Sequence, residues 1–323
     1  MKFGIIKERK NPPDRRVVFS PNEIKTIQEQ FPVVSFKVEP SDIRIFSDAE
    51  YQNLGIEVTD DLSDCEVLFG VKEVPVEALI PNKKYFFFSH TIKKQPYNQK
   101  LLQAVLEKNI ELYDHETIVD AANKRLIGFG RYAGIVGAYN AIRAFGIKFE
   151  LFKMPKASAL KGRDALVQQV KRQIIPPIKI VVTGTGKVGS GVKEMLLAMK
   201  IKEVSVENFL TKKFTQPVFT QIDVLEYNKR MDGQKFDTKD FYKNPSEYES
   251  DFERFTKVAD IYISGHFHAN AAPQILSQKM LQANDCAIKI VADVSCDVNG
   301  PIACTLRAST IEEPLYGYLP SEN

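Results

Sequence analysis

A glycine-rich turn lies in the middle of the chain, between residues typical of a β-strand and residues typical of an α-helix. Gly184, Gly186 and Gly189 follow the β-branched run 178–183, and apolar residues then recur at helical spacing. The first glycine permits a tight turn, the second lets the backbone approach a pyrophosphate, and the third lets helix and strand pack closely. The helix N-terminus adds N–H groups that favour an anion. The motif predicts a dinucleotide site; the alternative is a tight turn that binds nothing.

An acidic residue follows the turn at the distance expected for a contact with the adenosine ribose. We predict a strand at residues 204–206 that ends at Glu207, close to the offset of roughly 20 residues that such an acid occupies. A carboxylate there repels a 2′-phosphate and favours NAD, whereas Lys212 and Lys213 favour NADP. The expected cofactor is therefore written NAD(P)(H). Further cofactor contacts are assigned to residues around the turn and after two later strands: Thr185, Lys187, Val188, Gly265, Asp293 and Asp297.

Two of the polar patterns near the end of the chain have a structural as well as a functional interpretation. Asp293 and Asp297 flank the end of a predicted strand, where an aspartate orients the nicotinamide ribose or a catalytic group, or else caps a turn. His266 and His268 share a face if they lie on a strand, which resembles a pair of metal ligands. No third ligand is spaced nearby, so we expect no metal.

Two ionisable residues follow strand-like segments in the first part of the chain. Lys72 comes directly after residues 66–71, and His90 follows the aromatic segment 85–88. Ligands of open parallel sheets bind outside the carboxyl ends of the strands. If the two strands are neighbours, an ammonium and an imidazole face one crevice and can transfer protons. Glu73 and Glu116 are expected to tune their charge states. The alternatives are a solvated turn at Lys72 and a satisfied core histidine at His90.

Three further cations lie near predicted strand ends or helix starts, namely Arg16, Lys93 and Arg125. Together they can hold carboxylates, and arginine is suited to bidentate capture. Taken singly, each has the alternative interpretation of a surface charge. We therefore expect them to bind the substrate only if the fold brings them together.

Strand-like and helix-like segments alternate through residues 1–128, which predicts a mostly parallel sheet. Strands are expected near residues 3–6, 33–38, 66–71, 84–89 and 110–113, with helices at 20–30 and 99–108. Residues 128–147 are typical of a long connecting helix, and the polar, aromatic segment 209–255 is interpreted as an elaborated crossover. The expected fold is α/β, with two Rossmann-like domains separated by a cleft. A catalytic and substrate domain covers 1–128 with a return segment at 308–323, and an NAD(P)-binding domain covers 129–307.

The composition is that of an ordinary globular protein, with 44% hydrophobic and 26% charged residues and a net charge of +3. The mild basic excess is spread along the chain and indicates no nucleic-acid partner. No apolar run approaches the length of about 18 residues of a membrane span, and the N-terminal residues do not resemble a signal peptide. The four cysteines have no CxxC spacing, so we interpret them as reduced thiols of a cytoplasmic protein: Cys65, Cys286, Cys296 and Cys304.

Seven segments spread over the chain recur in the same order in one group of enzymes: Gly70-Val-Lys-Glu73, Phe88-Ser-His-Thr-Ile-Lys93, Arg125-Leu-Ile-Gly-Phe-Gly-Arg-Tyr-Ala-Gly134, Thr183-Gly-Thr-Gly186, Asn244-Pro-Ser-Glu-Tyr-Glu249, Asp293-Val-Ser-Cys-Asp297 and Ser309-Thr-Ile-Glu-Glu-Pro314. On these segments the chain resembles saccharopine dehydrogenases of the lysine-forming type. It resembles still more closely the lysine–2-oxoglutarate reductase domain of the bifunctional aminoadipic semialdehyde synthase. Alanine dehydrogenase and the transhydrogenase cofactor-binding domain share the implied fold but differ in the motifs after the lysine and the histidine.

The resemblance implies roles for the residues singled out above. Lys72 and His90 match the family's proton-transfer pair, and Glu73 and Glu116 match acids that modulate it. Residues that match contacts to substrate carboxylates are Arg16, Lys93 and Arg125. The implied reaction joins the lysine ε-amine to the keto carbon of 2-oxoglutarate, loses water, and reduces the imine to saccharopine with a hydride from NAD(P)H. The implied partners are these small molecules, with no nucleic acid or membrane, and the chain is expected to be a monomer or a homodimer.

One departure from the family concerns the end of the sequence. Family members continue beyond the Glu312-Glu-Pro314 segment with helices that return to the first domain, whereas this sequence ends at Asn323. We expect either a shortened chain or a hinge that closes differently. Two other functions stay open at this point: an amino-acid dehydrogenase of the alanine type, and a regulatory nucleotide-binding module without turnover.

Overall fold

The computed structural model describes residues 1–11, 13–266, 268 and 272–322. The chain divides into two compact units, Met1–Gly128 and Phe129–Asn323. Residues 308–323, expected to return to the first domain, are grouped with the second unit. Tyr316 ties them there, because its hydroxyl donates to the Cys304 carbonyl at 2.7 Å and accepts from the Leu306 amide at 3.0 Å.

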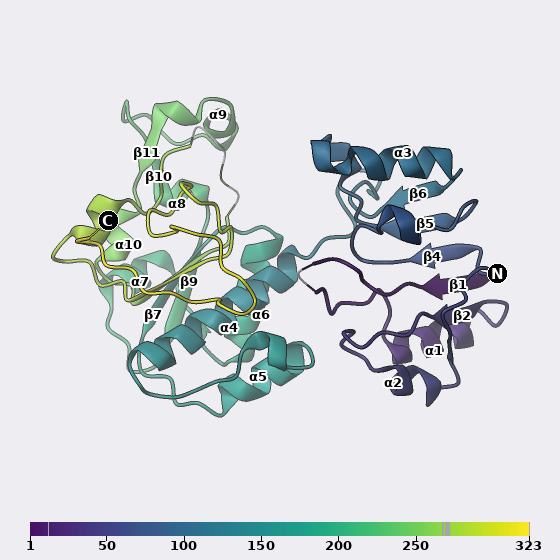
Figure 1. Ribbon diagram of the computed structural model, residues 1–323. Coiled ribbons are helices and arrows are strands. Elements are labelled where there is room, and N and C mark those ends of the chain that lie inside the picture. Colours follow the sequence, from purple (N-terminus) through teal and green to yellow (C-terminus); the bar gives the residue numbers. More distant parts are fainter. Residues whose placement is uncertain (12, 267, 269–271, 323) are drawn as a thin grey trace. The chain divides into compact units, whose positions relative to one another are not determined.

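The first unit is built around a six-stranded sheet in the order β3-β2-β1-β4-β5-β6 (Figure 1). All neighbouring strands are parallel, as the alternation of strands and helices predicts. The strands are β1 (Lys2–Ile5), β2 (Ser35–Val38), β3 (Glu57–Val58), β4 (Val67–Phe69), β5 (Lys84–Phe87) and β6 (Glu111–Asp114). Five of them match predicted strands, and the two-residue β3 is too short to give a sequence pattern.

Helices cover both faces of this sheet. They are α1 (Pro21–Gln30), α2 (Asp48–Gln52) and α3 (Gln99–Glu107), with single 3₁₀ turns η1 (Val76–Ala78), η2 (Thr91–Lys93) and η3 (Pro96–Asn98). Successive strand residues point to opposite faces. Leu68 accordingly packs in one cluster with Leu101 of α3, whereas Phe69 packs against a second cluster that contains Ile24 of α1 and Tyr51 of α2. The predicted start of α1 is confirmed by a capping box between Ser20 and Glu23.

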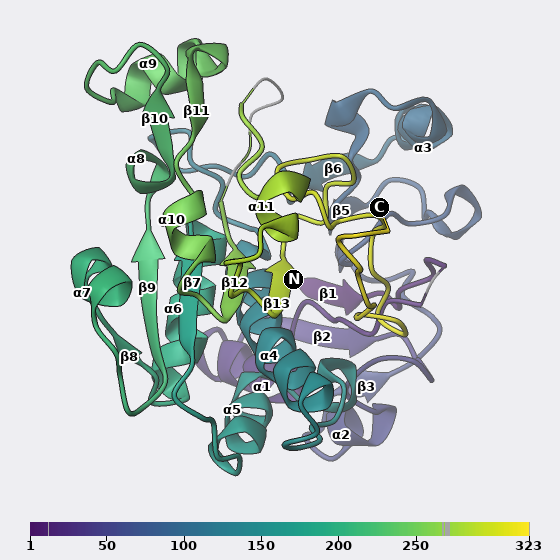
Figure 2. The ribbon, with the colours of Figure 1, turned by 90° about the vertical axis from the view of Figure 1, so that its left-hand side faces the viewer.

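The second unit contains a five-stranded parallel sheet in the order β13-β12-β7-β9-β8. Figure 2 shows β9, β7, β12 and β13 side by side. The strands are β7 (Lys179–Thr183), β8 (Lys202–Glu203), β9 (Val218–Ile222), β12 (Ile261–Ser264) and β13 (Ile290–Asp293), and a separate antiparallel hairpin pairs β10 (Asn228–Arg230) with β11 (Tyr248–Ser250). None of the helices in the described part of the chain has the length and hydropathy of a membrane span.

The helices of the second unit again lie against both faces of its sheet. They are α4 (Gly130–Lys148), α5 (Arg163–Lys171), α6 (Lys187–Ala198), α7 (Val206–Thr211), α8 (Val224–Tyr227), α9 (Thr238–Lys243), α10 (Glu253–Thr256) and α11 (Gln278–Gln282), with the 3₁₀ turns η4 (Ala157–Ala159) and η5 (Pro245–Glu247). Ile180 and Val182 of β7 pack with α4 and α6, whereas Val181 packs with the opposite cluster around Phe255. The long helix predicted at 128–147 is confirmed as α4.

Two sequence predictions for this unit are corrected. The prediction of a strand at residues 204–206 is wrong, because α7 begins at Val206. The Ser205 hydroxyl caps this helix by accepting from the Asn208 amide at 3.3 Å. The expected crossover at 209–255 also contains β9, a central strand of the sheet, whose pattern is hidden in a polar segment. His266 and His268 lie beyond the end of β12 and therefore do not share the face of a strand.

Gly134 of α4 is a position at which we expect a side chain to be poorly tolerated. A Cβ there would lie 2.0 Å from the Val188 carbonyl oxygen and 2.8 Å from the Val192 amide nitrogen, both backbone atoms of α6. Gly134→Ala should therefore lower the free energy of unfolding of the second unit by roughly 1–3 kcal/mol, measured by urea denaturation. The control Gly128→Ala meets no atom within 4 Å and should change it by less than about 0.5 kcal/mol. Equal stability of the two variants would contradict the close packing.

Candidate active site

The carboxyl ends of β4 and β5 bring Lys72 and His90 to one edge of the first sheet. The strands are parallel neighbours, with Phe69 opposite Phe86, so both end at the same edge. Lys72 lies three residues after the end of β4, and His90 lies three residues after the end of β5. The condition on which the sequence argument depends, that the two strands are neighbours, is thus met.

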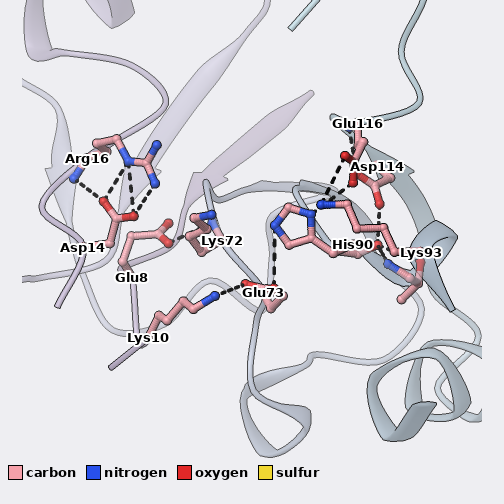
Figure 3. A network of polar contacts seen from close by, with 12 residues as sticks. Glu8, Lys10, Asp14, Arg16, Lys72, Glu73, His90, Lys93, Asp114 and Glu116 are labelled. Carbon is pink, nitrogen blue, oxygen red and sulfur yellow. Dashed lines mark hydrogen bonds and ion pairs between the residues drawn. The ribbon is translucent and has the colours of Figure 1, made fainter. Parts of the chain in front are cut away.

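The imidazole of His90 lies between two carboxylates (Figure 3). Its Nδ1 is 3.0 Å from Glu116 Oε2, and its Nε2 is 3.8 Å from Glu73 Oε1. The three side chains are each only about 15% exposed, and Glu73 Oε1 is buried with no hydrogen-bond partner among the described residues. Lys10 contacts the other oxygen of Glu73 at 3.1 Å. A ring held this way can accept or release a proton next to groups that respond to its charge.

Glu116 also connects two of the predicted substrate-binding cations. Lys93 Nζ and Arg125 Nη1 lie 3.5 and 3.4 Å from Glu116 Oε1. Burial raises the pKa of the Glu116 carboxyl, but the hydrogen bond from His90 and the charges of Lys93 and Arg125 outweigh burial and lower it. Both cations are about half exposed, so they can also reach a ligand carboxylate.

Lys72 is held through its backbone by a residue that the sequence did not single out. Glu8 accepts the Val71 amide at 2.7 Å and the Lys72 amide at 2.9 Å, which fixes the turn after β4. Burial lowers the pKa of the Lys72 ammonium, and the charges of Arg16 and Lys10 lower it further. A lysine with a lowered pKa is suited to proton transfer. The only sequence signal for Glu8 is that it follows β1. That signal is useful only once β1 is known to be the neighbour of β4.

Arg16 forms a close pair with Asp14, a second residue that sequence reasoning missed. Its Nε donates to Asp14 Oδ1 at 2.9 Å, and the hydrogen bond raises the pKa of the Arg16 guanidinium. Arg16 lies near enough to Lys72 to lower its pKa. All seven catalytic and substrate residues predicted in the first unit therefore lie in or beside one polar network.

In the glycine turn of the second unit, the backbone around each of the three glycines has the geometry that the sequence predicts. Gly184 adopts a φ of +91°, and a Cβ there would lie 2.6 Å from the Gly265 carbonyl oxygen. A Cβ on Gly189 would lie 1.9 Å from the Gly184 carbonyl oxygen, whereas one on Gly186 meets no atom within 4 Å. α6 begins at Lys187, directly after the open position. The turn therefore leaves backbone space at a helix N-terminus, which fits a pyrophosphate.

The acid that follows the strand beside this turn is Asp223 rather than Glu207. Glu207 lies in the first turn of α7, after the edge strand β8, and β9 separates β8 from β7. The Gly184 amide donates to the Ile222 carbonyl at 2.9 Å, and exposed Asp223 is the next residue. The sequence missed Asp223 because the strand before it was hidden in the crossover.

Asp293 has the capping role that was one of its two interpretations. Its carboxylate accepts from the hydroxyls of Ser264, Ser295 and Thr305 at 2.6–2.7 Å and so ties the end of β13 to β12 and to a later segment. The backbone carbonyl of Asp297 accepts the Gly300 amide in a turn. A contact of Asp293 or Asp297 with the cofactor stays a prediction.

The two histidines after β12 have separate environments. His266 Nδ1 is 2.7 Å from Thr183 Oγ1, and burial lowers the pKa of His266 to about 4. Its ring centre is 6.3 Å from that of His268. Within the described residues, no group of three or more potential ligands gathers around a metal position.

Comparisons with known proteins agree with this architecture. Residues 4–136 match the family model "Alanine dehydrogenase/PNT, N-terminal domain". The chain is 29% identical to an alpha-aminoadipic semialdehyde synthase of Arabidopsis thaliana over 99% of its own length, and 27% identical to the mitochondrial one of Rattus norvegicus over 98%. It covers only 34% and 38% of these relatives. It is 23% identical to a saccharopine dehydrogenase [NAD(+), L-lysine-forming] of Yarrowia lipolytica, covering 86% of this chain and 71% of that one.

Two solved structures share the fold. An L-alanine dehydrogenase matches with a TM-score of 0.57 and 17% identity, covering 98% of this chain and 80% of that one. A transhydrogenase from Sinorhizobium meliloti matches with a TM-score of 0.57 and 16% identity, covering 94% and 81%. The predicted α/β fold with two Rossmann-like parts is confirmed. The relatives named above agree with the resemblance noted in the sequence.

Glu116 should stabilise the first unit only while it is ionised. Because its pKa is lower in the folded protein than the ordinary value near 4.5, its contribution is complete above about pH 5 and is lost as the pH falls through the folded value. Glu116→Gln should lower the free energy of unfolding by about 1 kcal/mol at pH 7, and the difference should shrink toward pH 3.5, measured by urea denaturation. Glu107→Gln, an exposed position on α3, is the control. A pH-independent loss in Glu116→Gln would contradict the assigned cause.

Proposed function

We propose that this chain is a member of the saccharopine dehydrogenase and lysine–2-oxoglutarate reductase family, an NAD(P)-dependent oxidoreductase that interconverts saccharopine with L-lysine and 2-oxoglutarate. The observation that supports this most directly is that Lys72 and His90 lie at the same sheet edge, together with Glu73 and Glu116. The relatives are longer than this chain, so the proposal covers only the step that this part would perform.

The residue types suit each chemical step of the reaction. The lysine ε-amine forms a bond to the keto carbon of 2-oxoglutarate, and the ammonium must first lose a proton to a base. Loss of water from the resulting carbinolamine needs an acid that protonates the departing hydroxyl. Lys72 and His90 are the proposed donor and acceptor of these protons. When bound, NAD(P)H would supply the hydride for reduction of the imine to the secondary amine of saccharopine.

The surrounding charges suit a substrate with carboxylates. Arg16, Lys93 and Arg125 are proposed to bind them, as bidentate or single charge-assisted contacts. In the structure these cations contact carboxylates of the protein, Asp14 and Glu116. Substrate binding is then an exchange of one carboxylate partner for another, which limits the cost of removing the cations from water.

In the second unit, the glycine turn is proposed to hold the cofactor. Gly184, Gly186 and Gly189 would approach the pyrophosphate with the start of α6, with Thr185, Lys187 and Val188 contributing backbone and side-chain contacts. Asp223 is proposed to bind the adenosine ribose, since it follows the strand beside β7. On the other side of β7, Gly265 follows β12, Asp293 is the last residue of β13 and Asp297 lies after it, and these residues are proposed to face the nicotinamide half.

Turnover with defined substrates tests the function. NADH or NADPH oxidation should be observed with L-lysine and 2-oxoglutarate together and with neither alone. Oxidation only with pyruvate and ammonia would replace the proposal by an alanine-type dehydrogenase. Cofactor binding without turnover of either pair would indicate a regulatory module.

Replacing Lys72 should separate activity from stability. Lys72→Met should lower kcat/KM by at least about 100-fold, the contribution typical of a general acid or base. The free energy of unfolding at pH 7 should stay equal or rise, because a lowered folded pKa means that the charged ammonium opposes folding below that value. Steady-state kinetics and urea denaturation measure both effects. Lys25→Met on exposed α1 is the control, and a large loss of stability in Lys72→Met alone would contradict the charge argument.

The choice of ribose acid can be tested without turnover. Asp223→Asn should weaken NADH binding and reduce discrimination between NADH and NADPH by about tenfold, because a charge-assisted contact and a repulsion are both lost. Fluorescence titration of each cofactor measures the ratio of dissociation constants. Glu207→Gln serves as the matched control and should leave the ratio unchanged; the reverse result would return the assignment to Glu207.

A further inference from the structure

We propose that Asp114 is a positioning residue that holds His90 and Glu116 in contact. Its expected effect on turnover rests on the proposed function, whereas its effect on the His90 ring does not. Asp114 is the last residue of β6, next to β5, and is 7% exposed. It lies at the same sheet edge as His90 and Glu116 but contacts neither side chain directly. Figure 3 shows it beside them.

The carboxylate of Asp114 binds one group from each of the two segments that carry the pair. Oδ1 accepts the backbone amide of Glu116 at 2.8 Å, and Oδ2 accepts the hydroxyl of Ser89. The Thr117 hydroxyl donates to the Asp114 carbonyl at 3.0 Å and closes the same turn. One buried carboxylate therefore joins the loop after β5 to the loop after β6.

Ser89 transmits this constraint to His90, the next residue. Ser89 is completely buried, and its hydroxyl oxygen also accepts the Thr91 amide at 3.2 Å. His90 itself adopts the left-handed region, with a φ of 55°. This conformation is unfavourable by roughly 1 kcal/mol for residues other than glycine, so it persists only where the surroundings hold it. Ser89 supplies that restraint, because its hydroxyl is bonded both to Asp114 and to the amide of Thr91, the residue after His90.

The consequence concerns the 3.0 Å contact between His90 Nδ1 and Glu116 Oε2. Asp114 anchors Glu116 through its own backbone amide and anchors His90 through the preceding residue, Ser89. Removing the anchor releases the loop of His90 and the loop of Glu116 together. A displacement of about 1 Å at a reacting group can lower a rate by about 100-fold.

Asp114→Asn tests the inference with almost no change in shape. The amide nitrogen cannot accept the Ser89 hydroxyl and can only donate to its oxygen, so the charge-assisted hydrogen bond to Ser89 is replaced by a weaker neutral one of opposite direction. The chain has four histidines, and the ¹⁵N resonances of the His90 ring can be assigned with His90→Gln. These resonances should shift in Asp114→Asn, because the Nδ1 contact weakens. The kcat with lysine and 2-oxoglutarate should fall about 10- to 100-fold, with KM changed less than about twofold.

Glu39→Gln is the matched control for a purely structural effect. Glu39 is likewise 7% exposed and accepts a backbone amide, that of Lys7, at 2.9 Å, but it lies after β2. It should lose stability without a shift of the His90 resonances. If Asp114→Asn does not fold, Ser89→Ala removes the same hydrogen bond from its other partner and is measured in the same way.

Two results would overturn the inference: unchanged His90 resonances and kcat in a folded Asp114→Asn or Ser89→Ala variant, or equal changes in Glu39→Gln. A wild-type protein without lysine-dependent turnover would instead remove the proposed function. The ring resonances would still decide the role of Asp114.

Discussion

The parallel pairing of β4 with β5 is the interaction on which the candidate active site depends. Backbone hydrogen bonds between these strands, in a register that sets Phe69 opposite Phe86, bring two chain segments to the same edge of the sheet. Lys72 and His90 follow within a short turn, and Glu116 arrives from β6, the next parallel neighbour. A shift of one residue in either ladder would turn the side chains after it to the other face. The register of these strands thus determines which side chains meet at this edge, and the types of those side chains then determine the chemistry.

Charge compensation then determines what the assembled groups can do. Burial, together with the charges of nearby cations, lowers the pKa of the Lys72 ammonium, whereas His90 lies between two carboxylates. Lys93 and Arg125 share Glu116 with the histidine, and Lys10 shares Glu73. Because the groups share partners, substituting one of them changes the electrostatic environment of several others, and single substitutions are not expected to be additive. Backbone anchors such as Glu8 and Asp114 hold the charged groups close enough for this coupling.

In the second unit, strand order decides which acid accompanies the glycine turn. Glu207 and Asp223 are both acids downstream of the motif, and an offset counted along the sequence favours Glu207. The sheet order places β9 between β7 and β8, so the carboxyl end beside the turn belongs to Asp223. The offset is informative only where the chain goes from the glycine helix straight to the neighbouring strand. Here it first visits the edge of the sheet and returns.

The sequence by itself determined the features that depend on local chemistry. The glycine turn with its helix, the capping box of α1, most parallel strands of the first unit and the residues that follow them can all be predicted, because each results from patterns within about ten residues. Strand neighbours, the position of β9, and the hydrogen bonds of Glu8 with the Lys72 turn and of Asp114 with Ser89 were decided only by the tertiary structure. Those features join residues far apart in the chain, such as Glu8 with Lys72 or Gly184 with Ile222. Their partners are selected by how whole sheets pack, and no local pattern contains that information.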